Sequence, residues 1–356
     1  MKLPVDIPAL LSAAIDIEKA RAIPVSVNIL VDESASGAFQ VFVRAGFNSE
    51  SPNSRVMVSY FPTQTPDPTI PCDLAVIAAG ENPGIGALAA SLREAGTPVL
   101  VVAERGDEVR AAAERAGAPL PEGDVLSPKL GQPFDEDLAG ALADEIGTWI
   151  TRSCAESKRL ALSIAYPFVR RPLAYEAVRA TSWQNAGVGV VVFIPGADMP
   201  VMTANQAKMV LQIAAAYGQP LSADRIKELA GVLLNAFVWR GVARQLAGAV
   251  PALGWAIKGT MGFAGTQAIG RAAIQYFEGG GDIAGLASVV SKAVSTAADV
   301  TETVRSQPSV KAVAAVVGPA ARTAAGAALD AAAPVAQNAA GVVFRSLRPG
   351  RKKGKK

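Results

Sequence analysis

The chain has 356 residues, which is enough for two domains of ordinary size. It contains no histidine, so every catalytic triad, general base or metal site that depends on histidine is excluded. Half of the residues are apolar but only 6% are aromatic, so Ala, Val and Gly supply most of the apolar content. Residues 1–150 hold 10 basic and 21 acidic residues, whereas residues 151–356 hold 24 basic and 10 acidic residues. An acidic half is thus joined to a basic half, and we expect the two halves to bind different partners.

Residues 1–150 are predicted to form an α/β domain with a parallel sheet. Short apolar runs alternate with segments of helical pattern, and this alternation is typical of a parallel sheet that is covered by helices on both faces. The predicted strands are residues 25–31, 55–61, 74–79, 99–103 and 125–127. Ligands of such sheets bind beyond the carboxyl ends of the strands, so the loops that follow the strands are the first candidates for a functional site.

The loop after the first predicted strand stands where a phosphate-binding P-loop would read GxxxxGK[ST]. The degenerate positions are Asp32 at the first glycine, Gly37 at the second glycine, Ala38 at the lysine and Phe39 at the hydroxyl residue. The lysine would balance phosphate charge and the hydroxyl would hold Mg²⁺, so their replacement opposes the binding of a nucleoside triphosphate. We expect no hydrolysis here, no bound cofactor and no metal.

The order of strands and loops resembles an Era-like small GTPase domain with degenerate motifs. VLVVAERGD is similar to the strand and loop that carry the guanine-specifying NKxD motif, of which Asp107 is the residue retained. Residues 125–129, VLSPK, resemble the later serine-containing loop that contacts the base, whereas the switch aspartate expected after residues 56–61 is missing. The resemblance covers about the first 150 residues and implies a pseudo-GTPase. The alternative is a generic α/β domain in which these loops are only turns.

The two cysteines, Cys72 and Cys154, are far apart in the sequence and form no CxxC motif, so we expect reduced thiols in a cytoplasmic protein. The opening MKLPVDIPALL has prolines and an aspartate in place of the continuous apolar core of a secretory signal, and we expect no such signal.

Residues 135–166 are predicted to form one long helix that leads into a helical domain at residues 151–290. Its arginines, such as Arg179, precede an apolar run, a pattern typical of a cytoplasmic membrane boundary and equally of a solvated helix face.

Residues 187–218 are predicted to fold as a helix, a break and a second helix. Pro195 and Gly196 stop the apolar run. Asp198 is placed to cap the second helix, and Pro200 falls in its first turn, where a missing N–H costs little. Gly218, with a proline two residues later, is predicted to end that helix.

Within the second helix, Gln206 falls near the apolar face and Lys208 lies away from it. The stretch PGADMPVMTANQAKMVLQIAAAYG and residues 255–280 together resemble a bacterial helical domain of unknown function, which is often fused behind Era-like GTPase domains and also occurs in YcjF-like membrane proteins. The resemblance implies a membrane-associated module and favours a GTPase-derived first domain.

The helical domain contains no run of 18 uncharged apolar residues, which favours peripheral or re-entrant membrane association over a full span, with a soluble bundle as the alternative. Residues 291–356 are Ala-rich, and the last 12, RSLRPGRKKGKK, include seven basic residues and no acidic one. Such a tail is suited to anionic lipid headgroups and, since it has no aromatic side chains for stacking, is less suited to nucleic acid.

We therefore expect a non-catalytic, membrane-associated regulatory or interaction protein at the inner face of the membrane. Its acidic domain would bind a protein partner, and its helical domain would meet an anionic membrane surface or form oligomers. Two alternatives stay open: a nucleotide-binding GTPase-like protein with an unorthodox loop, and a soluble scaffold whose basic half contacts nucleic acid.

Overall fold

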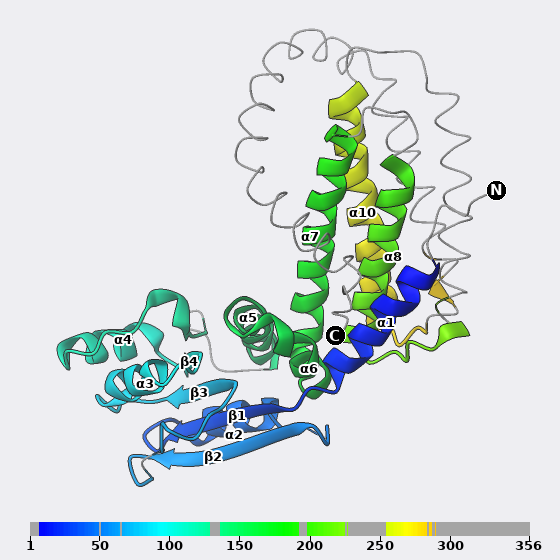
Figure 1. Cartoon of the computed structure of the whole chain (residues 1–356). Coiled ribbons are helices and arrows are strands. Elements are labelled where there is room, and N and C mark those ends of the chain that lie inside the picture. Colours follow the sequence, from blue (N-terminus) through cyan, green and yellow to red (C-terminus); the bar gives the residue numbers. More distant parts are fainter. Residues whose placement is uncertain are drawn as a thin grey trace, which may run out of the picture. The chain divides into compact units, whose positions relative to one another are not determined.

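The computed structural model describes residues 7–49, 51–64, 66–128, 136–191, 198–224, 226, 254–282, 285–286 and 289. All of them except Gly254 belong to one compact unit, residues 1–248 and 255–297. In chain order its helices and strands (Figure 1) are α1 Ile7–Arg21, β1 Val25–Asp32, α2 Gly37–Gly46, β2 Ser54–Phe61, β3 Leu74–Ala79, α3 Ile85–Glu94, β4 Val99–Ala103, α4 Gly106–Arg115, the 3-10 turn η1 Glu122–Asp124, β5 Val125–Leu126, α5 Glu136–Ser153, α6 Glu156–Ala165, the 3-10 turn η2 Pro167–Val169, α7 Arg170–Val191, α8 Asp198–Ala216 and α10 Gly254–Glu278.

The five strands form a parallel sheet with the order β2-β1-β3-β4-β5. Each lies within one residue of its predicted bounds. The predicted class, a parallel α/β sheet followed by helices, is therefore confirmed. The chain moves from β1 outward to β2 and then crosses back to β3 on the other side of β1. The carboxyl ends of β1 and β3 therefore flank the switch point of a doubly wound sheet, where ligands of such sheets bind.

Helices cover both faces of the sheet. Alternate residues of β1 point to opposite faces: Val27 and Ile29 pack with α2, α5 and α6, whereas Leu30 packs with α3 and α4. The central strands β3 and β4 are buried along their whole length, as the continuous apolar runs LAVIAA and VLVVA require.

The prediction of one helix over residues 135–166 is wrong, because α5 ends at Ser153 and α6 begins at Glu156. Between them Ala155 is extended, with φ −56° and ψ 132°. Arg159 then caps the end of α5: its Nε donates to the carbonyl oxygen of Cys154 at 3.0 Å and its Nη2 to that of Arg152 at 3.4 Å. The break lets both helices pack on the same face of the sheet, which helical periodicity alone does not reveal.

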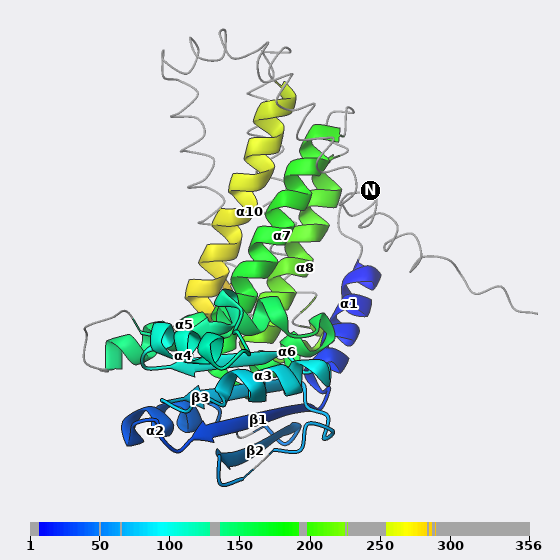
Figure 2. The ribbon, with the colours of Figure 1, turned by 90° about the vertical axis from the view of Figure 1, so that its left-hand side faces the viewer.

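Helices α7, α8 and α10 run side by side and share a second core (Figures 1 and 2). Helix α1 belongs to this core, since Leu10, Ala14 and Ile17 pack into it. Arg21, at the end of α1, donates to the carbonyl oxygens of Gly218 and Gln219. The first helix of the acidic half therefore packs on the helical region.

Small residues let these helices approach closely. A Cβ atom at Gly270 of α10 would lie 2.3 Å from a methyl carbon of Val178 in α7, so no other residue fits without a shift. Gly218 follows α8 with φ 77°, as predicted for a glycine that ends a helix. In the described part of the chain, no helix combines the length and the apolar character that crossing a membrane requires.

Candidate functional site

The switch point between β1 and β3 is closed by the carboxylate of Asp32. This side chain is fully buried at the end of β1. Its Oδ1 accepts hydrogen bonds from the N–H and the hydroxyl of Ser34, at 3.0 and 2.9 Å. Its Oδ2 accepts from the N–H groups of Gly80 and Asn82 in the loop after β3, at 2.8 and 3.2 Å. The backbone donors that could bind an outside anion at this point therefore already bind one that belongs to the protein.

The contact between the two loops leaves no free space. A Cβ atom at Gly80 would lie 2.4 Å from the backbone nitrogen of Ala35 and 2.5 Å from Oγ of Ser34. The hydroxyl of Ser34 also accepts a hydrogen bond from the N–H of Glu81 at 2.7 Å. The loops after β1 and β3 are thus joined directly, and no side chain fits at Gly80 without a shift.

A second carboxylate lies at the start of α2, where a P-loop would hold phosphate. Ser36 caps this helix, and its hydroxyl accepts from the N–H of Phe39. The same hydroxyl donates to Oε1 of Glu104, at the end of β4, at 2.7 Å, and the Ser36 N–H points to Oε2 at 3.4 Å. Glu104 is therefore the anion at this helix N-terminus, a position that favours negative charge.

The other P-loop positions have ordinary structural roles. Phe39 is fully buried between α2 and the sheet, with its ring centroid 6.2 Å from that of Phe42. Ala38 is exposed, and a Cβ atom at Gly37 would meet no atom within 4 Å. The residue at the magnesium-ligand position is thus part of the core, and the one at the lysine position offers no charge.

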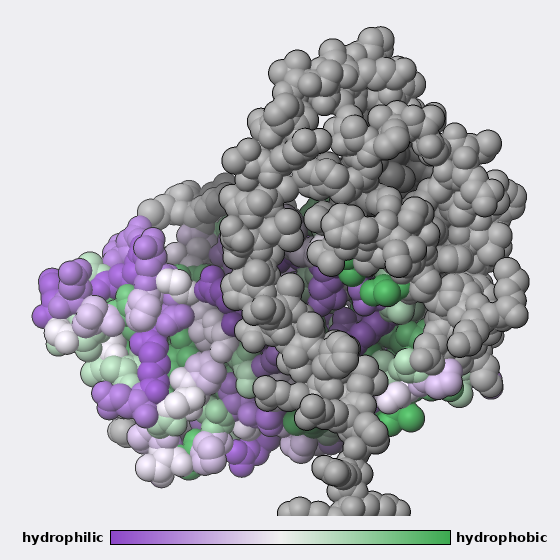
Figure 3. Space-filling model, turned by 45° about the horizontal axis from the view of Figure 1, so that its top comes forward, coloured by the Kyte–Doolittle hydropathy of each residue, from purple (hydrophilic) through white to green (hydrophobic). Residues whose placement is uncertain are grey.

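The two loops that resemble base-contacting loops do lie together. They line a small pocket of about 230 Å³ formed by Glu104, Arg105, Gly106, Asp107, Glu108, Ser127 and Pro128. Its charged groups are largely paired within the protein: Asp107 forms an ion pair with Arg110, and Arg105 binds Glu81 and Glu108. Acidic side chains dominate this edge of the sheet, and hydrophilic residues, purple in Figure 3, gather over the α/β domain. Such a surface disfavours an anionic ligand.

The helical motif positions are separate from this edge. Pro195 and Gly196 lie outside the described residues, and α8 begins at Asp198, with Pro200 in its first turn. Lys208 is exposed on α8. None of these positions lines the pocket beside Asp107 or the pocket at the opposite edge of the sheet.

Gln206 belongs to a buried polar network that joins three helices. Its Nε2 donates to Oγ1 of Thr266 in α10 at 3.0 Å. Asn185 in α7 donates to the same oxygen at 2.9 Å and to the carbonyl oxygen of Met202 at 3.4 Å, and Asn205 donates to Oδ1 of Asn185 at 2.9 Å. Because buried amides need such partners, the network fixes how α7, α8 and α10 align along their axes.

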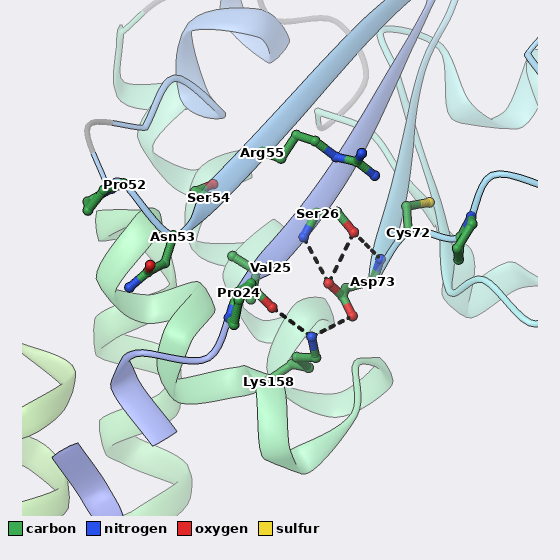
Figure 4. A pocket seen from close by; sticks show the side chains of 11 residues that line it. Pro24, Val25, Ser26, Pro52, Asn53, Ser54, Arg55, Cys72, Asp73 and Lys158 are labelled. Atoms are coloured by element: carbon green, nitrogen blue, oxygen red, sulfur yellow. Dashed lines mark hydrogen bonds and ion pairs between the residues drawn. The ribbon is translucent and has the colours of Figure 1, made fainter. Parts of the chain in front are cut away.

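A larger pocket, about 520 Å³, lies at the opposite, amino-terminal edge of the sheet (Figure 4). Lys158 from α6 donates to the carbonyl oxygen of Pro24 at 2.6 Å and forms an ion pair with Asp73 at 3.1 Å. Asp73 in turn accepts from the N–H of Ser26 at 2.8 Å. Sequence reasoning missed this pocket because its residues come from four separate segments and form no motif. Its ion pair and hydrogen bonds join β1, the residue before β3 and α6.

Burial of both thiols disfavours their reactive thiolate form. Cys154 is buried, and burial raises its pKa to about 12, partly opposed by the charge of Arg159. Burial also raises the pKa of the partly exposed Cys72, with the nearby Thr97 hydroxyl opposing the shift. Neither residue forms a disulfide. Within the described ranges, no group of three Cys, Asp or Glu side chains is arranged to hold a metal ion.

We expect Ellman's reagent at pH 8 to modify Cys72 slowly in the native protein and Cys154 only after unfolding. A pKa near 12 leaves about one thiolate in 10,000 molecules of Cys154 at pH 8. The Cys72→Ser variant is the control and should show no reactive thiol until denaturant is added. Rapid modification of two thiols in the native state would contradict the burial of Cys154.

These observations define a class of protein: a doubly wound α/β domain whose switch point is closed by its own carboxylates, followed by helices that share an apolar core. Residues 168–299 match the model of a family described as Domain of unknown function (DUF697), which places α7, α8 and α10 in a DUF697 domain. The predicted helical domain of unknown function is thus confirmed over these residues. No curated protein and no solved structure matches the chain.

Proposed function

We propose that this protein is a non-catalytic, membrane-associated interaction protein whose α/β domain is a pseudo-GTPase. The observation that carries the proposal is the closure of the switch point by Asp32 and Glu104. Each carboxylate takes backbone or hydroxyl donors that a phosphate group would need. An incoming phosphate would have to displace a buried, fully bonded carboxylate and then meet the remaining acids of this edge.

The acidic surface suits a protein partner with a basic patch. Residues 1–150 carry an excess of 11 negative charges, and exposed acids such as Glu33 and Glu81 flank the closed switch point. The basic half, with an excess of 14 positive charges, suits the anionic inner face of a membrane. The protein would therefore hold a partner at that surface without chemical turnover.

The competing function is nucleotide binding by an unorthodox loop. The pocket of about 230 Å³ between the loops after β4 and β5 favours it, because these are the loops that resemble base-contacting loops. In that case the base would lie against Asp107 and Ser127, and the phosphates would have to lie away from Asp32.

Thermal unfolding with Mg²⁺ and GDP, GTP or ATP decides between the two. We expect no change in melting temperature for any nucleotide, compared with a sodium chloride control of the same ionic strength. A ligand at 100 times its Kd would add about 2.7 kcal/mol to the free energy of unfolding, which is easily measured. A nucleotide-specific shift that is lost in Asp107→Ala would overturn the pseudo-GTPase proposal and establish the competing one.

A further inference from the structure

Three exposed cations lie at one level of the helical domain, which is about one turn deep, and each of the long helices carries one of them. Gly270 packs against Val178, so the following residues, Arg271 of α10 and Arg179 of α7, lie at the same height along the helices. Lys208 lies one turn beyond Asn205, which bonds to Asn185 two turns above Arg179. Because α8 runs antiparallel to α7, Lys208 lies about one turn nearer the far ends of the helices than Arg179 does, close to the height of Trp183.

Charges on the two sides of this level differ. On the side nearer α5, two arginines form ion pairs: Arg171 binds Asp144 at 3.5 Å and Glu278 at 3.4 Å, and Arg159 binds Glu176 at 3.0 Å. A third, Arg170, donates to the carbonyl oxygen of Ser163 at 3.2 Å. The three cations of the level, by contrast, form no ion pair with any described residue. Unpaired exposed charges of one sign at one height are suited to a planar anionic surface.

On the other side, the three helices carry no charge for two to three turns. The uncharged segments, which we call the distal surface, are residues 180–191, 199–207 and 259–270. Their exposed residues include two large apolar side chains, Trp183 (66% exposed) and Val201 (46% exposed). The Trp183 ring lies 5.1 Å from that of Phe263, edge to face, so an aromatic pair joins α7 and α10.

The spacing of these features fits the edge of a bilayer. Trp183 is one turn beyond Arg179, about 6 Å along the helix, which is close to the thickness of one headgroup layer. Tryptophan prefers that boundary, with cations on its aqueous side. The uncharged run of α7 is about 18 Å long, too short for a hydrocarbon core of about 30 Å. Asp198 and Lys258 at the far ends of the other two runs also oppose a complete crossing.

We propose that the distal surface enters one leaflet of an anionic membrane, with the charged groups of Arg179, Lys208 and Arg271 at the lipid headgroups and Trp183 with Phe263 at the boundary below the two arginines. This proposal rests on the membrane association proposed above and adds which surface, which end of the helices and which headgroup charge are involved. The chemistry it requires of the lipid is a phosphate or carboxylate headgroup with net negative charge.

Binding of the full chain to vesicles of phosphatidylcholine, with and without phosphatidylglycerol, tests the proposal. We expect the variant with Arg179→Gln, Lys208→Gln and Arg271→Gln to bind anionic vesicles about 100-fold more weakly than the native chain. A matched variant with Arg44→Gln, Arg55→Gln and Arg115→Gln, which removes three exposed cations of the α/β domain, should bind as the native chain does. All six positions are exposed, so unchanged melting temperatures are expected for both variants.

Tryptophan quenching by brominated lipid tests the placement of Trp183 separately. Quenching of the native chain should exceed that of Trp183→Phe, because the other three tryptophans are common to both. If both triple variants weaken binding equally, or if Trp183→Phe leaves quenching unchanged, the distal surface is wrong although membrane association stands. If the native chain binds no vesicle at all, the membrane part of the proposed function falls as well.

Discussion

The Asp32→Ala variant is expected to lose about 3–5 kcal/mol of unfolding free energy, a large part of the 5–15 kcal/mol typical of a domain. Its carboxylate is the acceptor for the N–H groups of Ser34, Gly80 and Asn82, and alanine leaves all three without it. The neighbouring loops pack too tightly for a water molecule to replace it without a shift, since Gly80 already touches Ser34 and Ala35. Chemical denaturation of the full chain measures the loss.

Two further variants serve as controls for this prediction. Glu33→Ala changes the next acid in the sequence, which is exposed, and should leave the free energy of unfolding unchanged. Asp32→Asn keeps one oxygen acceptor and should lose less than Asp32→Ala. Equal stability of Asp32→Ala and Glu33→Ala would show that the switch point is not held closed in this way.

The strands could be predicted because each is a short apolar run flanked by turn residues, and the central ones are buried on both faces. The closure of the switch point could not be predicted, because Asp32 meets Gly80 and Asn82 across 48 and 50 residues. Comparison with the P-loop motif showed that Asp32 replaces the first glycine, but it did not indicate what the carboxylate of Asp32 does.

The same limit applies to the helices. Local pattern predicted where α8 ends, at a glycine with φ 77°. It did not predict that α1 packs on α8, since the hydrogen bond from Arg21 to Gln219 joins residues 198 apart. Nor did it reveal the break between α5 and α6, which depends on Arg159 reaching back to the carbonyl oxygen of Cys154. Periodicity identifies the buried face of a helix but gives no information about distant partners.

The Gly270→Ala variant is expected to lose about 1–3 kcal/mol of unfolding free energy through overpacking. Helix propensity alone would make the same change favourable by about 1 kcal/mol. The steric cost is expected to exceed the gain in helix propensity, because the new Cβ atom would lie 2.3 Å from one methyl carbon of Val178 and 2.7 Å from the other. Gly265→Ala is the matched control in the same helix: a Cβ atom there meets nothing within 4 Å, so this variant should be as stable as the native protein or more so.

A double-mutant cycle with Val178→Ala isolates the contact. Val178→Ala alone should destabilise the protein by removing two buried methyl groups, but it also opens the space that the added methyl group of Gly270→Ala needs. The double variant should therefore be more stable than the sum of the two single losses predicts, by about 1–2 kcal/mol. Additive losses would mean that α7 and α10 do not approach at these residues. Because this approach places Arg179 and Arg271 at a similar height along their helices, additive losses would also remove the basis for a common cation level, and the proposed membrane-facing surface with it.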